Sequence, residues 1–218
     1  MTTARAALPA PRLNAVPPSA DDVAALERTW RDPPGIVGWF AAINHKAIGK
    51  RFIVTAFCFF VAGGLLAAAM RMQLARPDNH LIGPDLYNQI FTMHGSTMMF
   101  LFAVPVMQAM SIYLVPLMLG SRSVAFPRMN AYAYWVYLFG GLMLFVAFAL
   151  NSGPDVGWFA YPPLSGPDYG TGKRADFWAQ MITFTEFSGL LEAVILISGV
   201  FKLRAPGMTL NRMPLFVW

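Results

Sequence analysis

The chain has 218 residues, of which 56% are hydrophobic and only 12% are charged. Soluble domains carry roughly twice that share of charged residues, so the composition indicates a membrane protein and argues against an ordinary soluble enzyme. The net charge of +5 does not indicate nucleic-acid binding, because the basic residues lie at the ends of apolar runs and form no single patch.

The N-terminal residues 1–35 are rich in proline, carry mixed charges and lack the apolar core of a signal peptide. They predict a mobile cytoplasmic tail, with a short interfacial helix near residues 24–30. An amphipathic segment with a basic end leads from this tail into a membrane domain, which we expect to span residues 36–218.

Four long apolar segments follow, and each reaches the roughly 20 residues that a helix needs to cross a bilayer. They predict an all-α transmembrane fold with helices over residues 52–70, 90–119, 131–150 and 178–201. The second segment contains Pro105 and Pro116, so we expect it to be tilted or kinked. The apolar residues 213–218 predict the start of a fifth helix.

The lysines and arginines are divided unequally between the two ends of these segments. Twelve of the 16 fall on the side of the two termini, and four fall in the intervening loops 71–89 and 151–177. The positive-inside rule therefore predicts cytoplasmic termini and an outer side formed by those two loops.

Soluble-enzyme chemistry finds no support in the sequence. It contains no glycine-rich phosphate loop after a strand, no paired cysteines and no zinc-protease motif. His45, His80 and His94 occur in such different settings that a Ser-His-Asp triad is not expected. The single cysteine, Cys58, excludes a disulfide within the chain.

His94 lies near the predicted outer end of the second helix, followed by Gly95 and, one turn later, Met98. An ionisable group in a membrane segment is a candidate functional residue, and neutral imidazole is a common haem ligand. Gly95 lets a planar ring approach the backbone, and Met98 lies on the helix face of His94, where it can pack on a macrocycle. The residues alone leave two interpretations open: a ligand, or a histidine hydrogen-bonded between helices.

The first helix offers a face of small residues around Gly63 and Gly64 and ends at Arg71. Small residues allow close packing of helices, and they equally leave room for a flat cofactor. Arg71 either extends to lipid headgroups or donates hydrogen bonds to a buried carbonyl or carboxylate group.

The fourth helix contains two acidic residues, Glu186 and Glu192. Their spacing places them about 120° apart around the helix, so they cannot form one carboxylate pair. Thr183, Thr185 and Ser188 flank Glu186, which makes it the stronger candidate for a proton relay. The alternative is a protonated acid hydrogen-bonded to a neighbouring helix or subunit.

Several stretches resemble the N-terminal part of subunit I of haem–copper terminal oxidases of the cytochrome c oxidase type. They occur in family order and spacing: "NHKAIGKRF" (44–52), "LYNQIFTMHGSTMMFLFAVPV" (86–106), "YLVPLMLGSRSVAFPRMN" (113–130), "GWFAYPPLSG" (157–166) and "MPLFVW" (213–218). The resemblance implies the N-terminal helices of the subunit I bundle, in a multi-pass protein of the bacterial inner membrane.

The resemblance also implies roles for individual residues. His94 matches an axial ligand to the iron of the low-spin haem, and Arg71 matches the arginine that bonds the formyl group of haem a. Trp158 matches a tryptophan close to the haem propionates, while Tyr87 and Gly63 fall where the family lines the haem pocket.

Residues of a family proton channel are only partly present. Ser123 stands where pumping members carry an aspartate, and Phe52, Ile112 and Ile195 stand where they carry polar residues. Because apolar walls hold no ordered water, we expect the usual route to be absent or rebuilt. The remaining candidates for a proton path are Glu186, Asn130, Ser123 and Ser188. Gln73 replaces an acidic residue that binds a structural cation in several members, so we expect that site to be weak.

The family's second haem ligand, its copper-ligating histidines and its haem a3 ligand lie beyond residue 218. Haem a3 and copper B therefore require a further part of subunit I, whether this chain is truncated or split. The resemblance implies reduction of O2 to water coupled to proton movement, with subunits of types II and III as partners in lipid and cytochrome c or quinol as electron donor. A haem-less structural or assembly protein derived from an oxidase is the alternative function.

Overall fold

The computed structural model describes residues 19–30, 34–170 and 172–218, with the side chains of residues 29 and 30 left out. Most of the predicted tail, residues 1–18 and 31–33, lies outside the described residues. The chain divides into two units, residues 1–41 and 42–218. The first contains helix α1 (Ala20–Trp30), which includes the short helix predicted near residues 24–30, and helix α2 (Gly35–Ala41).

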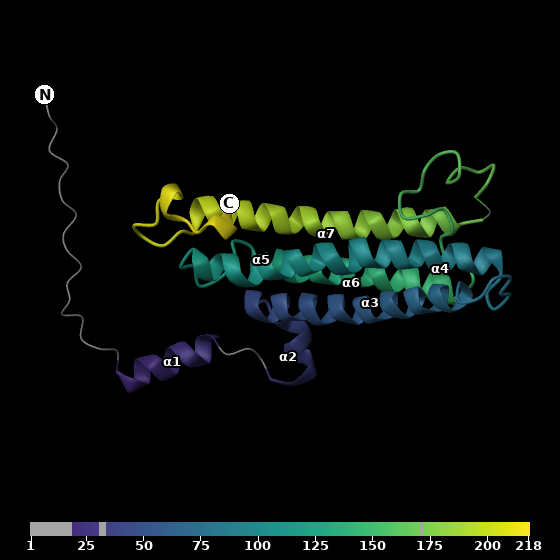
Figure 1. Cartoon of the computed structure of the whole chain (residues 1–218). Helices are drawn as coiled ribbons and strands as arrows, with labels where there is room; N and C mark the ends of the chain where they lie inside the picture. Colours follow the sequence, from purple (N-terminus) through teal and green to yellow (C-terminus); the bar gives the residue numbers. More distant parts are fainter. Residues whose placement is uncertain (1–18, 31–33, 171) are drawn as a thin grey trace, which may run out of the picture. The chain divides into compact units, whose positions relative to one another are not determined.

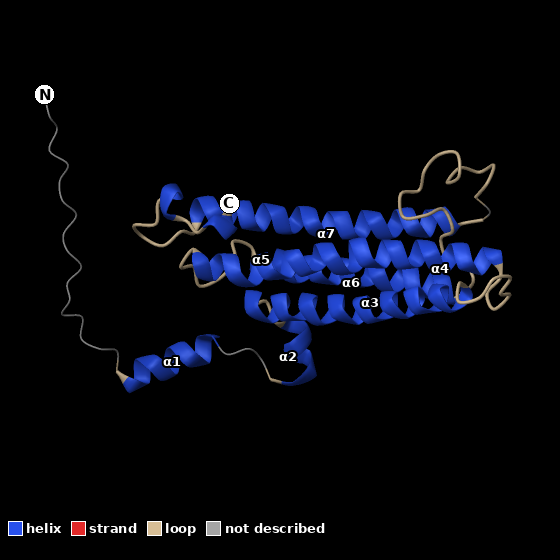
Figure 2. Ribbon diagram, viewed as in Figure 1, coloured by secondary structure: helices blue, strands red, loops and turns tan. Residues whose placement is uncertain are grey.

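The second unit is a bundle of four long helical rods, as the apolar segments predicted (Figure 1). The rods are α3 (His45–Gln73), then α4 (Pro84–Ser96) continued by the π-helix η1 (Thr97–Ala103) and by α5 (Val104–Met118), then α6 (Pro127–Ala149) and α7 (Arg174–Lys202). Successive rods run in opposite directions. All described elements are helices joined by loops (Figure 2).

Every rod begins several residues before its predicted start, because polar residues with helix-starting chemistry come before the apolar run. Asn44 caps α3 by accepting a hydrogen bond from the Lys46 amide at 3.0 Å. Pro84 and Pro127 occupy the first positions of α4 and α6, where a missing N–H costs nothing. The two ends of the bundle are named here by their loops. The cap end holds residues 74–83 and 150–173, and the opposite end holds residues 119–126 and 203–218.

The second rod contains a π-helix, η1, which ends two residues before Pro105 of α5. The tilt or kink expected from its prolines stays a prediction. Proline has no N–H to donate to the carbonyl of residue 101, four positions earlier. The Tyr137 hydroxyl of α6 donates to that carbonyl of Leu101 at 2.6 Å. A side chain from another helix thus satisfies the backbone group that the proline leaves open.

Close approaches at glycine and stacked aromatic rings hold the rods together. A Cβ at Gly141 of α6 would lie 2.5 Å from Cζ of Phe59, and one at Gly140 would lie 2.7 Å from Cβ of Phe184. Phe52 and Tyr137, both almost fully buried, stack with their ring centroids 5.2 Å apart. Packing of this kind drives helix association in a bilayer, where lipid and side chains are equally apolar.

The segment after α7 contains two short 3-10 helices, η2 (Leu210–Arg212) and η3 (Leu215–Val217). It folds back on the opposite end of the bundle, where Met213 packs with Val115 and Leu119 of α5. The fifth membrane helix predicted to start at residue 213 therefore remains a prediction.

Candidate functional site

His94 is half-buried on α4, facing α3. Its Nδ1 lies 2.9 Å from the carbonyl oxygen of Gly63. A carbonyl oxygen only accepts, so Nδ1 carries the hydrogen and the lone pair of the neutral imidazole is on Nε2. This is the arrangement by which metal-binding histidines are oriented, with the second nitrogen left to the metal.

Gly63 allows the close approach of α3 that this hydrogen bond needs. A Cβ at residue 63 would lie 2.9 Å from Sδ of Met98 and 3.4 Å from Cγ2 of Thr97. Gly63 is buried by this packing, whereas a Cβ at Gly64 would meet open space. The structure therefore agrees with both interpretations of the small residues on α3. Gly63 allows close helix packing, and Gly64 leaves space that a flat cofactor could occupy.

Gly95 was expected to leave room for the planar ring of a cofactor. In the structure, a tryptophan side chain of the chain itself lies against it. A Cβ at Gly95 would lie 2.9 Å from Cδ1 of the Trp158 indole. The loop that carries Trp158 is attached to α4, where the Gly157 amide donates to Oγ1 of Thr92 at 2.8 Å. The prediction that Gly95 makes room for a planar cofactor is therefore wrong, and its role is to seat Trp158 beside His94.

Arg71 and Tyr87 lie about two helical turns from this cluster, toward the cap end. Arg71 is exposed on α3 and Tyr87 is half-buried on α4. The structure thus brings Gly63, Met98 and Trp158 together around His94, and it places Arg71 and Tyr87 farther along the same pair of helices.

A cluster of charged residues that sequence reasoning missed joins the segments at the cap end. Nη1 of Arg174 lies 2.6 Å from Oδ1 of Asp85 and 2.8 Å from Oδ2 of Asp155. One arginine therefore connects the start of α4, the start of α7 and the loop that carries Trp158. Sequence could not pair these residues, since they lie 89 and 19 positions apart.

Replacing Arg174 with glutamine is expected to loosen the cap end. Asp85 is 64% exposed, so most of the effect comes from the pair with Asp155, whose side chain is 19% exposed. We expect the unfolding free energy to fall by about 1 kcal/mol, the upper end for such pairs. Thermal unfolding in detergent measures this, and Arg76→Gln, at an exposed position of the same end, is the control. Equal melting temperatures for both variants would contradict the prediction.

Gln73 also acts at the cap end. Its side chain accepts a hydrogen bond from the Ile82 amide at 2.7 Å and donates to the carbonyl oxygen of Asn79. Both ends of the amide therefore hold the loop 74–83. The weak cation site expected at this residue stays a prediction.

The four proton-path candidates do not come together. Asn130 of α6 and Ser188 of α7 are buried, and Ser123 lies in the loop at the opposite end. Glu186 is exposed on the other side of α7.

The hydroxyl groups expected around Glu186 bind backbone carbonyls. Thr183 donates to Ala179, Thr185 to Met181 and Ser188 to Ala133, at 2.9, 3.1 and 2.9 Å. The predicted hydroxyl lining of Glu186 is therefore wrong.

Glu192 is the acidic residue that the structure buries, although the sequence favoured Glu186. It belongs to the buried stripe of α7, at a helical spacing of three to four residues: Met181, Thr185, Ser188, Glu192, Ile195 and Gly199. The helical period of these positions was the sequence signal that could have identified Glu192 as the buried acid.

Comparison with known proteins yields one family. The family model described as "Cytochrome C and Quinol oxidase polypeptide I" matches residues 47–218. A "Probable cytochrome c oxidase subunit 1-alpha" of Streptomyces avermitilis is 44% identical over 191 residues, which cover 86% of this chain and 33% of the relative. A "Cytochrome c oxidase subunit 1" of Alkalihalophilus pseudofirmus is 40% identical over 180 residues, covering 83% of this chain and 29% of that protein. The chain thus spans about a third of the length of the curated relatives it matches.

Proposed function

Because the chain belongs to the cytochrome c and quinol oxidase polypeptide I family, we propose that it forms the low-spin haem-binding part of the catalytic subunit of a respiratory terminal oxidase. His94 would hold the haem iron through Nε2. The remaining ligand, haem a3 and copper B come from a further part of subunit I.

The hydrogen bond from His94 Nδ1 to the Gly63 carbonyl supports this proposal most directly. It selects the tautomer that offers Nε2 to a metal and fixes the ring against rotation. The open space beside Gly64 agrees with a flat cofactor at this face of α3. The residues present therefore fit a haem.

The residues around His94 have separate roles in the proposed site. Met98 of η1 packs against Gly63, whose carbonyl binds His94, and Trp158 covers Gly95, the residue after His94. Arg71, which is exposed, would donate hydrogen bonds to a polar substituent of the haem, such as the formyl group of haem a. The haem, when bound, supplies one-electron transfer toward the oxygen-reducing site.

The rest of the proposal follows from the family. Electrons originate from cytochrome c or quinol and O2 is reduced to water, in a complex with the rest of subunit I and subunits of types II and III. The orientation, with cytoplasmic termini, rests on the distribution of basic residues.

Absorbance of the purified complex, together with oxygen consumption, tests the proposal. We expect a reduced low-spin haem band and oxygen uptake on addition of an electron donor. A complex that contains this chain and lacks haem would favour a structural or assembly role. Comparing reduced cytochrome c with a quinol as donor decides between the two oxidase classes.

A further inference from the structure

Two polar side chains near the opposite end of the bundle are fully enclosed and have no hydrogen-bond partner. Glu192 of α7 is 1% exposed, and neither carboxyl oxygen is bonded. Asn130 of α6 is 0% exposed, and neither its amide oxygen nor its nitrogen is bonded. Buried polar groups almost always have a partner, so two in one region need an explanation.

The antiparallel register of α6 and α7 brings these two residues to the same level. Gly140 lies beside the Met181 carbonyl, and Ser188 donates to the Ala133 carbonyl. Continuing this register by one turn places Asn130 level with residues 191 and 192. Both side chains are buried on their helices at this level of the bundle.

Helix α5 also packs against α7 at this level and runs parallel to it. Nε2 of Gln108 lies 2.8 Å from the position of a Cβ at Gly189, one turn from Glu192. The same register sets the buried Ile112 beside Glu192.

No charged group among the described residues faces Glu192 from the helices that pack against α7. On α6, Arg128 is exposed, Tyr132 packs on Phe187, and the hydroxyls of Tyr134 and Tyr137 bond Thr55 and Leu101. On α5, Tyr113 lies against Gly49 of α3, and η1 contains no titratable residue. On α7 itself, Glu186 and Lys202 are exposed.

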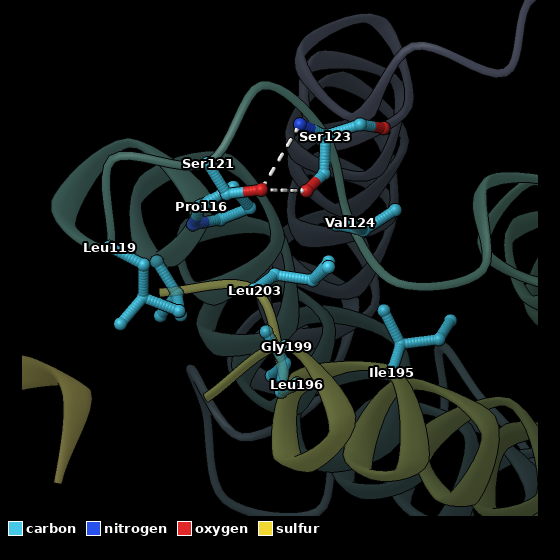
Figure 3. Close-up of a pocket in the computed structure, with 10 residues that line it drawn as sticks. Pro116, Leu119, Ser121, Ser123, Val124, Ile195, Leu196, Gly199 and Leu203 are labelled. Carbon is cyan, nitrogen blue, oxygen red and sulfur yellow. Dashed lines mark hydrogen bonds between the residues drawn. The ribbon is translucent and has the colours of Figure 1, made fainter. Parts of the chain in front are cut away.

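A pocket lies at the opposite end of the bundle (Figure 3). Ser121 and Ser123 stand on one side, facing Ile195 and Gly199 of α7. Ile195 is one turn from Glu192 on the same buried stripe. The pocket is therefore lined by a residue that lies about one helical turn from Glu192 along α7.

From these observations, we propose that Glu192 is a proton-carrying acid within the membrane, that Asn130 is its partner through a bridging water, and that protons reach it from the Ser121–Ser123 pocket. An unpaired carboxylate buried among apolar groups is costly, so the resting form is the neutral acid. It releases its proton to an acceptor deeper in the complex and takes another from water in the pocket. A buried water needs two to four polar partners, and the carboxyl and amide atoms supply them.

A purely structural role for Glu192 fits the geometry less well. A carboxyl group retained for helix association would bond a neighbouring helix, as Ser188 does with Ala133. Ionisable residues buried in membrane segments without an ion pair are typical of proton relays. The inference deepens the proposed oxidase function, and it depends on that function only for the destination of the proton.

The test uses the purified complex, with infrared spectroscopy of protonated carboxyl groups and the rate of proton uptake during turnover. Glu192→Gln preserves shape and removes the titratable proton. We expect it to remove one carboxyl band that shifts in heavy water. Proton uptake should fall by about 100-fold, the lower end for a positioned proton-transfer group. Glu186→Gln, the matched control on the exposed face of α7, should change neither quantity. Glu192→Asp should restore the band.

An unchanged carboxyl band and unchanged uptake in Glu192→Gln would overturn the inference. Asn130→Leu provides a second measurement if the first variant fails to assemble, because it leaves the acid in place. We expect the band to move and uptake to slow in that variant, and an unmoved band would overturn the bridging water. A complex without haem would refute the oxidase proposal alone, since the infrared band still reports on Glu192.

Discussion

Replacing His94 with alanine is expected to abolish the low-spin haem absorbance of the purified complex. The substitution removes the only nitrogen that α4 offers to the iron and the hydrogen bond that fixes α4 against the Gly63 carbonyl. An axial ligand has no substitute among its helical neighbours, because Gly95, Ser96 and Thr97 cannot bind haem iron strongly. Reduced-minus-oxidised absorbance and extraction of the haem measure the result.

The control for His94→Ala is His80→Ala, which removes the same ring from the exposed loop 74–83. We expect this variant to keep its haem and its oxygen uptake. Imidazole added to His94→Gly should restore part of the absorbance, since it supplies the missing ligand. A full low-spin haem band in His94→Ala would refute the assignment of His94.

Introducing leucine at Gly141 is expected to prevent α6 from packing against α3. Even the first added carbon would lie 2.5 Å from the Phe59 ring and 3.2 Å from Cδ2 of Leu101. Both neighbours are buried, so neither has space to move. Overpacking in a core costs about 1–3 kcal/mol, and we expect Gly141→Leu to reach the upper end because the carbon meets a ring. Thermal unfolding in detergent and the yield of folded protein measure the cost.

A matched pair of alanine variants isolates this steric effect from helix propensity. Gly141→Ala and Gly64→Ala each gain about 1 kcal/mol in helix propensity. A Cβ at Gly64 meets nothing within 4 Å, so Gly64→Ala should unfold at the same or a higher temperature than the unchanged protein. Gly141→Ala should unfold at a lower one. A melting temperature for Gly141→Ala equal to that of Gly64→Ala would contradict the packing argument.

The architecture was largely predictable because a membrane span is a local property. About 20 consecutive apolar residues suffice to identify a helix that crosses a bilayer. The four helices and the family were therefore predicted correctly. Their ends were less well predicted, since residues such as Asn44 and Pro84 start helices outside the apolar runs.

The site was predictable only in part. His94, Gly63 and Met98 were placed together by motif and helical spacing, and the structure brings them into one cluster. The ring beside Gly95 was not predictable, because Trp158 lies more than 60 positions away in a loop. The same holds for the Arg174 cluster, whose members come from three separate segments.

The sequence by itself determined that this is a four-helix membrane protein of the oxidase subunit I family, with His94 as its candidate ligand. Only the tertiary structure decided which faces of the helices turn inward. In a bilayer the outer face of a helix is as apolar as its inner face, so hydrophobicity does not distinguish them. Close contacts at glycine and polar contacts across helices do distinguish them. They bury Glu192 and leave Glu186 exposed, although the two residues are only six positions apart on the same helix.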